Sequence, residues 1–268
     1  MAKVDPTLTN STRQAWLRQL RKRFRELNGR VNRIFSQGKA PLDPEFTEFF
    51  QGWISQQSEA LLGGDWQDKY VEQAYAKGIL LSRIPSGLDK IHLDAIKQIQ
   101  IQAKNEVQAA LAVMVSQATD KVSRGTLEGI SKASMAALVK DRVEKIGRTR
   151  SLLVANTLTP YASNVAEVNA AVITGEDIKM RWITQGDERV RTTHALRNGK
   201  LYSPKAALNL LGEPNCRCRV EPMVKGEDEK EYERIREAGL AVSIEAQREQ
   251  EFWRTLAKER QALGFPPG

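Results

Sequence analysis

The chain is poor in the residues that mark a disulfide-stapled or membrane-spanning protein. Its 268 residues include two cysteines, Cys216 and Cys218, and two histidines, His92 and His194. Two cysteines cannot supply a disulfide framework in so long a chain, which agrees with a reducing compartment. No apolar run approaches the roughly 20 residues that a membrane-spanning helix needs, and the first residues lack the apolar core of a signal peptide. We therefore expect a protein that is made in the cytoplasm and meets no membrane during its assembly.

Motifs of common catalytic sites are missing as well. The sequence has no glycine-rich phosphate loop, no nucleophile elbow and no pair of candidate catalytic acids. One arrangement could support catalysis: His194 as general base oriented by Asp187, with Arg189 and Arg191 holding a phosphate. A phosphodiester-acting enzyme, such as a nuclease, is therefore the alternative hypothesis. Because adjacent acidic and arginine residues are also typical of a surface turn, we predict that the protein is not an enzyme.

Positive charge is abundant but concentrated near the N-terminus. The net charge of the chain is +8, and residues 1–40 alone carry ten basic and two acidic residues, which equals the whole excess. Such a basic arm indicates contact with nucleic acid or with an acidic protein surface, while a solvated helix face without a partner is the plainer interpretation. The candidate contact residues are Arg18, Arg21, Lys22, Arg23, Arg25, Arg30 and Arg33.

The first two thirds of the chain have the apolar spacing of helices. This spacing predicts helices over 11–37, 44–62, 65–82 and 89–123. Gly125 is expected to interrupt the last of these, and Thr126 to cap the helix that follows. A further helix, or a pair of helices around Pro160, is expected up to about residue 175. We expect His92, on the long helix, to be a partly exposed polar residue.

The pattern changes after Gly175. A short strand is expected over 180–184 and another over 216–224, where Cys216, Cys218 and Val220 would share one face of the strand. We predict a mostly helical fold with a small α+β module. The expected divisions are a basic helical arm at 1–40, a long-helix domain at 41–174, a compact mixed module at 175–224 and a charged helical tail at 225–268.

The two cysteines raise the question of a metal. His194, Cys216 and Cys218 are ligand types that zinc prefers. However, Cys-x-Cys is a less common spacing than Cys-x-x-Cys, and a fourth ligand would have to be Asp187, Glu188 or water. A disulfide between Cys216 and Cys218 would be strained. We predict no metal and no other cofactor, with the two cysteines as small buried groups and with His194, Cys216 and Cys218 as the candidates if zinc does bind.

Four motifs follow one another in this region: Trp182, then Asp187-x-Arg189-x-Arg191-x-x-His194, then Asn198-Gly199, then Asn215-Cys216-Arg217-Cys218. Their order resembles the phage head-morphogenesis family, the minor head proteins similar to protein F of phage Mu. The match covers about residues 141–224. Relatives with Cys-x-x-Cys and Cys-x-Cys have a natural four-thiolate zinc site, whereas Arg191 and His194 stand at two of those places here. The residues of the predicted structural motif are Trp182, Asp187, Arg189, Arg191, His194, Asn198, Gly199, Asn215, Cys216, Arg217 and Cys218.

The resemblance implies a minor structural protein of a tailed-phage procapsid. Such a protein would associate with the portal protein and contact packaged DNA, with scaffold or major capsid protein as further candidate partners. Its expected place is the virion, inside the head near the portal, after assembly in the host cytoplasm. The basic residues between Arg18 and Arg33 would then contact DNA or the portal, and such binding to DNA should weaken steeply with salt.

Overall fold

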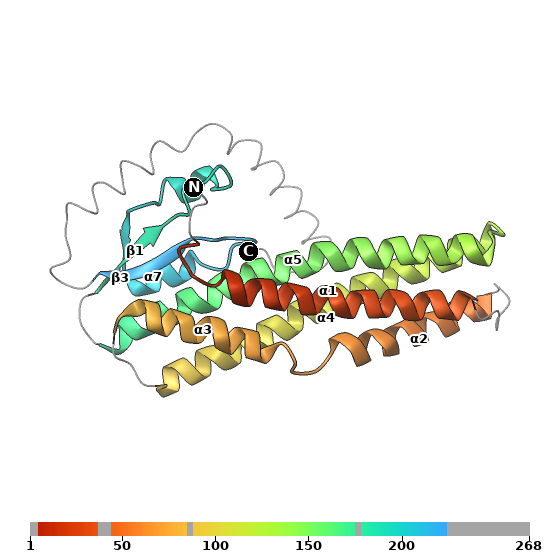
Figure 1. Ribbon diagram of the computed structural model, residues 1–268, viewed down its shortest axis with the longest axis horizontal. Coiled ribbons are helices and arrows are strands. Elements are labelled where there is room, and N and C mark those ends of the chain that lie inside the picture. Colours follow the sequence, from red (N-terminus) through yellow and green to blue (C-terminus); the bar gives the residue numbers. More distant parts are fainter. Residues whose placement is uncertain (1–4, 37–43, 85–87, 175–177, 224–268) are drawn as a thin grey trace. The chain divides into compact units, whose positions relative to one another are not determined.

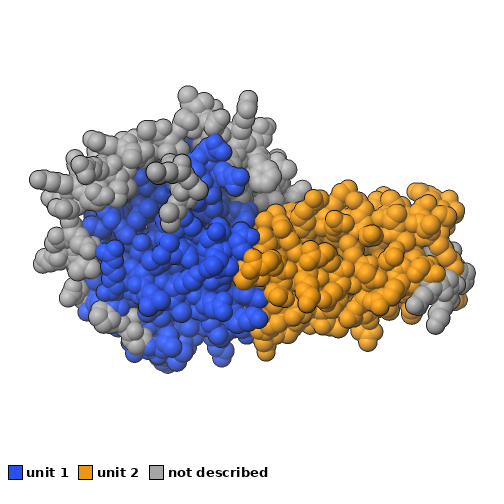
Figure 2. Space-filling view, viewed as in Figure 1, with its two compact units in different colours: residues 1–14, 68–101, 155–268 blue, residues 15–67, 102–154 orange. Residues whose placement is uncertain are grey.

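A computed structural model describes residues 5–36, 44–84, 88–174 and 178–223. It divides the chain into two compact units, each assembled from separate stretches of sequence (Figure 2). Unit 1 comprises residues 1–14, 68–101 and 155–268, and unit 2 comprises residues 15–67 and 102–154. Neither the four predicted divisions of the chain nor their boundaries are tested by this structure, and the predicted charged tail at 225–268 lies outside the described residues.

Unit 2 is built from helices that run lengthwise beside one another (Figure 1). Their apolar stripes face inward, because residues three and four positions apart lie on one side of a helix. Trp16, Leu27, Phe50 and Met114 are fully or almost fully buried in this way. The contributing elements are most of α1 (Asn10–Ser36), all of α2 (Pro44–Leu62), and parts of α4 (Lys90–Leu127) and α5 (Lys132–Ile173).

Close approach of two helices in unit 2 depends on a glycine. A Cβ placed on Gly147 of α5 would lie 2.5 Å from the ring of Phe24 on α1. No side chain tolerates that distance without a shift of the neighbouring ring, so the absence of a side chain at this position lets α1 and α5 pack tightly. The apolar stripe of α1 is therefore buried inside unit 2, where it contributes to the core.

Unit 1 combines helices with a small sheet. Its strands are β1 (Lys179–Ile183), β2 (Leu201–Tyr202) and β3 (Arg219–Met223). They are arranged in the order β2-β1-β3, and the sheet is antiparallel throughout. Met180, Trp182 and Val220 are completely buried on its inner face, where they pack with Val168 of α5 and Ala207 of α7. The helices that lie wholly in unit 1 are α3 (Asp68–Ser82), α6 (Thr192–Ala195) and α7 (Pro204–Asn209).

The predicted fold class, mostly helical with a small α+β module, is confirmed. One prediction that fails concerns Gly125: α4 continues through it to Leu127, and Ser131, in place of Thr126, precedes the next helix and accepts a hydrogen bond from the backbone N–H of Ser134 at 3.2 Å. A single glycine costs a helix only about 1 kcal/mol, and Gly125 lies close to Met135 and Ile130. Packing therefore outweighs the local preference.

The structure decides one open alternative and corrects one local expectation. The segment around Pro160 forms one continuous helix, α5, and not a pair of helices. His92 is completely buried, with its Nδ1 2.8 Å from the hydroxyl of Tyr75. That hydroxyl also accepts a hydrogen bond from Asn169 Nδ2 at 3.0 Å. His92 is thus part of a buried polar network in unit 1, which the apolar spacing of α4 alone could not indicate.

Among the described residues, no helix combines the length and the apolar character needed to cross a membrane.

Candidate functional site

The structure brings His194 together with both cysteines in unit 1. His194 lies in the short helix α6 and is 2% exposed. Its Nδ1 is 3.3 Å from Cys218 Sγ and 3.5 Å from Cys216 Sγ. Cys218 is buried and Cys216 is half-buried, and both are free thiols. The Trp182 ring and the imidazole pack in a T-shaped arrangement, with 5.6 Å between ring centroids and an angle of 88° between the ring planes.

Glu213 is the main functional-site residue that the sequence did not reveal. Its Oε2 accepts a hydrogen bond from His194 Nε2 at 2.8 Å and another from Arg191 Nη1 at 2.7 Å. Its Oε1 accepts from Arg197 Nη1 at 2.9 Å. Because a carboxylate only accepts hydrogen bonds, Nε2 of the imidazole must carry the proton. In the neutral imidazole the lone pair is then on Nδ1, the nitrogen that faces the two sulfur atoms.

These contacts shift the pKa of each group in the cluster. Burial disfavours the Glu213 carboxylate, but hydrogen bonds from His194 and Arg197 and the charge of Arg191 outweigh it and lower the pKa of Glu213 to about 2. Burial would lower the pKa of His194, but its bonds to Cys216 and Glu213 raise it above the usual value. The cluster therefore holds a carboxylate on one side of the ring and favours a protonated, positively charged imidazole.

The two thiols are driven in opposite directions. A hydrogen bond from Cys218, together with the neighbouring His194, lowers the pKa of Cys216 well below that of an ordinary thiol. The same hydrogen bond raises the pKa of Cys218. Cys216 is thus the thiol that ionises first, and thiolate is the form of cysteine that binds metals and acts as a nucleophile.

The chain that carries the cysteines is fixed by residues of α5. Asn164 Nδ2 donates to the carbonyl of Cys218 at 2.9 Å, and Asn164 Oδ1 accepts from the backbone N–H of Val220 at 2.8 Å. Thr157 Oγ1 accepts from the backbone N–H of Asn215 at 2.9 Å. Asn215 has a φ of 54°, a left-handed conformation that asparagine adopts more readily than most residues. The chain bends at Asn215, and β3 begins only at Arg219. The expected strand began at Cys216, three residues earlier.

The remaining motif residues support the same region. Arg217 pairs with Asp187 through two hydrogen bonds of 2.8 and 2.9 Å. Asn198 Oδ1 accepts from the backbone N–H of Thr184 at 2.8 Å. Gly199 has a φ of 76°, which permits a tight turn at Asn198-Gly199, and its N–H donates to the carbonyl of Trp182 at 2.7 Å. The side chain of Arg189 is exposed.

This arrangement does not favour the nuclease alternative. A general base must reach the proton that it removes, yet His194 is buried and both of its ring nitrogens already have partners. Arg191 is likewise engaged by Glu213 and by the carbonyl of Pro214. Of the four residues in that hypothesis, Arg189 alone has an exposed side chain.

The seven basic residues predicted to contact DNA or the portal fall into two groups on α1. Arg18, Lys22, Arg25 and Arg33 are exposed, and we call these four the basic row. The others are partly buried. Among them, Arg23 donates to the carbonyl of Leu61 and stacks over Trp66, with its guanidinium carbon 4.2 Å from the ring centroid. Arg30 donates to Gln57.

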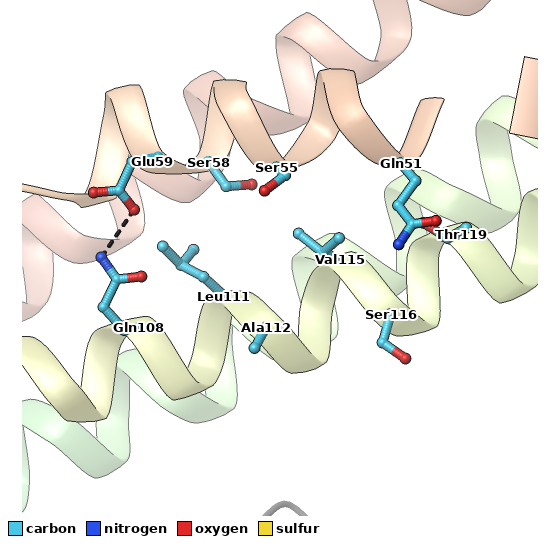
Figure 3. A pocket seen from close by; sticks show the side chains of 10 residues that line it. All are labelled: Gln51, Ser55, Ser58, Glu59, Gln108, Leu111, Ala112, Val115, Ser116 and Thr119. Carbon is cyan, nitrogen blue, oxygen red and sulfur yellow. Dashed lines mark hydrogen bonds between the residues drawn. The ribbon is translucent and has the colours of Figure 1, made fainter. Parts of the chain in front are cut away.

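Unit 2 also contains a groove of about 390 Å³ between α2 and α4 (Figure 3). Short polar side chains line much of it, including Ser55 and Ser116, and at one end Gln108 donates to Glu59 Oε2 at 2.8 Å. The residues described in its lining include no cysteine and no histidine. It therefore lacks the ligand and base chemistry that the cluster around His194 provides.

Comparison with known families supports a phage protein. Residues 116–221 match the family model described as Phage Mu protein F like protein. This segment begins in α4, contains all of α5 and ends in β3, so it includes every residue of the structural motif between Trp182 and Cys218. No curated protein and no solved structure gives a significant match.

This family match supports the resemblance to the phage head-morphogenesis family that the motifs indicated. The match to the phage Mu protein F like family covers residues 116–221, and it starts about 25 residues before the segment recognised from motifs alone.

Proposed function

We propose that this protein is a minor structural protein of the head of a tailed phage, that it associates with the portal protein, and that it contacts the packaged DNA. The family of residues 116–221 supports a role in head morphogenesis. The observation that carries the proposed DNA contact is the basic row, Arg18, Lys22, Arg25 and Arg33, exposed on a helix whose apolar face is buried.

The spacing of the basic row suits a polyanion. At 100° per residue its four side chains lie within an arc of about 80°, and at 1.5 Å per residue they extend over about 22 Å. A row of this kind can follow a phosphate backbone without requiring a particular base sequence. The one acidic residue of α1, Glu26, lies 4.0 Å from Lys22 at the surface and neutralises only part of the row, since such exposed pairs are weak.

Because the apolar face of α1 is buried, the proposed DNA contact has to be tested by substitution and not by deletion. Deleting residues 1–40 would remove Trp16, Leu20 and Leu27 from the core of unit 2, so loss of function in that deletion would reflect unfolding. Substitution of the exposed basic residues avoids this problem. We define the row variant as R18Q/K22Q/R25Q/R33Q, and a control with the same change in charge as K90Q/K97Q/K140Q/K205Q, at exposed residues elsewhere.

Co-purification tests the proposed association with the portal protein and the presence of the protein in the phage head. The full chain, co-expressed with the portal protein of the same phage, should elute with the portal ring, and purified particles should contain it in few copies per head. The row variant should keep the portal association if the portal is bound by other surfaces, and should lose it if the row itself docks there. Absence of the wild-type protein from both the ring and the particles would overturn the proposal.

A further inference from the structure

We propose that His194, Cys216 and Cys218 form a metal site of the zinc type, in which Nδ1 of the histidine and the two sulfur atoms are the protein ligands. These are the three groups that the sequence analysis named as candidates while predicting no metal. The site is independent of the proposed head function, because the inference depends only on the geometry of unit 1.

The distances between the ligand atoms suit a tetrahedral ion. Zinc binds sulfur at about 2.3 Å and nitrogen at about 2.0 Å, which in a tetrahedron separates nitrogen and sulfur by about 3.5 Å. The observed separations from His194 Nδ1 are 3.3 Å to Cys218 Sγ and 3.5 Å to Cys216 Sγ. All three ligand atoms lie within 4.8 Å of one another. Small side-chain movements would bring them around one ion.

The histidine is already oriented as a ligand. Metal-binding histidines usually donate their second N–H to a carboxylate or carbonyl, which fixes the tautomer and the plane of the ring. Here His194 Nε2 donates to Glu213 at 2.8 Å, so Nδ1 presents its lone pair to the sulfur atoms when the ring is neutral. Glu213 is itself held by Arg191 and Arg197. The outer contacts of a metal site are therefore in place.

The cavity beside the three ligands and the charge of the site also suit a zinc ion. A small cavity of about 20 Å³ is lined by His194, Cys216 and Cys218, with Arg191 and Asn215 among its other walls. A cavity of this size accommodates about one water molecule, which would serve as the fourth ligand. Two thiolates and a neutral imidazole would balance the charge of a Zn²⁺ ion, and the charge of Glu213 is balanced by its arginine partners.

Zinc is favoured over harder ions by the donor atoms. Thiolate and imidazole suit zinc and other soft or intermediate transition metals, whereas calcium and magnesium prefer oxygen. The rigid attachment of the cysteines, through Asn164 to Cys218 and through Thr157 to Asn215, would hold the two sulfur atoms in position. We infer a structural role, in which the ion ties α6 to the chain that leads into β3.

Cobalt substitution tests the site directly. The reduced full-length protein, stripped with a chelator, is titrated with Co²⁺, and the purified protein is assayed separately for zinc. We expect one equivalent of either metal per chain and a thiolate-to-cobalt charge-transfer band. C216S and C218S should each lose about half of that band or all binding. Glu144→Gln, at an exposed residue of α5 outside the cluster, should match the wild type.

A second variant separates binding from folding. Glu213→Gln keeps all three ligands but weakens the contact that orients the ring, and loss of such an outer contact typically costs about 10- to 100-fold in metal affinity. We expect weaker binding with the charge-transfer band retained at saturation. If a cysteine variant fails to fold, the Co²⁺ titration of the wild type still shows whether a thiolate site binds the metal. No charge-transfer band in the reduced wild type, or a band unchanged in folded C216S and C218S, would overturn the proposal.

Discussion

The two units of the chain hold their charged side chains in different ways. In unit 2 the ion pairs are exposed: the Arg124 and Asp120 side chains are 68% and 47% accessible. In unit 1 the pairs are largely buried, and Arg219 and Glu167 are 13% and 0% accessible. Unit 2 is held by apolar helix stripes and carries the basic row on its surface. In the module of unit 1, by contrast, arginines form buried ion pairs that link neighbouring elements.

The difference has a physical origin in the shape of each unit. Long helices bury a continuous apolar stripe and need no buried charge. The three-stranded sheet is small, with strands of two to five residues, and offers little apolar area. Arg181 on β1 pairs with Glu221 on β3, and Arg219 on β3 pairs with Glu167 on α5. These pairs link neighbouring elements where apolar contact is limited, and breaking one should cost more than breaking an exposed pair.

The largest effect is expected for Arg219→Ala. Glu167 accepts three hydrogen bonds from this guanidinium at 2.6 to 3.0 Å, so the substitution leaves a buried carboxylate without its partner. Such a loss typically lowers the free energy of unfolding by about 3 to 5 kcal/mol. Arg124→Ala, which breaks the exposed pair in unit 2, should cost less than about 1 kcal/mol. Urea denaturation measures the free energy of unfolding of both variants. Equal losses would contradict the difference between buried ion pairs in unit 1 and exposed ion pairs in unit 2.

The apolar core of unit 2 is tested by a matched pair of leucines. Leu27 is completely buried, whereas Leu127 is 83% exposed. Leu27→Ala should lower the free energy of unfolding by about 3 kcal/mol, as expected for loss of a buried side chain with the cavity left behind. Leu127→Ala should change it by less than about 0.5 kcal/mol. A small effect at Leu27 would mean that α1 is not part of the core.

Glycine substitutions examine the close contact between α1 and α5. Gly147→Ala places a Cβ 2.5 Å from the Phe24 ring and should lower the free energy of unfolding by about 1 to 3 kcal/mol, the usual cost of overpacking. Gly52→Ala, in α2, has no atom within 4 Å of the new Cβ and should stabilise by up to about 1 kcal/mol, since alanine favours helix. Thermal unfolding should therefore move in opposite directions for the two variants, and a shift in the same direction would contradict the packing described.

The buried carboxylate of unit 1 also predicts a pH dependence. Burial raises the pKa of Glu167 to about 7, although hydrogen bonds from Arg219 oppose this. The folded state therefore holds a proton that the unfolded state releases above about pH 4.5, so this group contributes stability below that pH and loses it as the pH rises to about 7. Glu221 adds to the effect by repulsion. The decline should be on the order of 1 kcal/mol or more.

Glu167→Gln provides the control for this dependence. The amide does not titrate, so the change in unfolding free energy between pH 4.5 and pH 7 should be smaller in the variant than in the wild type. The comparison of slopes is unaffected by any constant loss of stability that the substitution causes. Parallel slopes would show that Glu167 does not titrate in this range.

Much of the fold could be predicted from the sequence because apolar spacing is a local signal. The expected helix over 11–37 is observed as α1, Asn10–Ser36, and the expected strand over 180–184 as β1, Lys179–Ile183. The alternation around Cys218 and Val220 correctly placed both side chains inward. Where one residue broke a local pattern, as at Gly125, packing against residues further along the chain decided the outcome.

The candidate site was predictable only in part. Its cysteines, histidine and Asp187 form a recognisable motif, but their supporting partners lie elsewhere. Asn164 reaches Cys218 across 54 residues, and Glu213 reaches His194 across 19 residues. No periodic pattern connects such pairs, since a single asparagine or glutamate in a polar stretch looks the same whether or not it is buried. Likewise, the sequence could not separate the exposed basic row from Arg23 and Arg30, which unit 2 uses internally.

The smallest effect on stability, and the most direct test of the central claim, concerns the basic row. We expect the basic row of unit 2 to contact DNA, and not the ion-paired arginines of unit 1. Affinity for a DNA duplex is measured at several salt concentrations for the wild type, the row variant and the control with the same charge change. Each lost phosphate contact lowers the salt slope by about 0.9, so we predict a slope smaller by about 3 to 4 in the row variant alone. Equal slopes for the wild type and the row variant would contradict it.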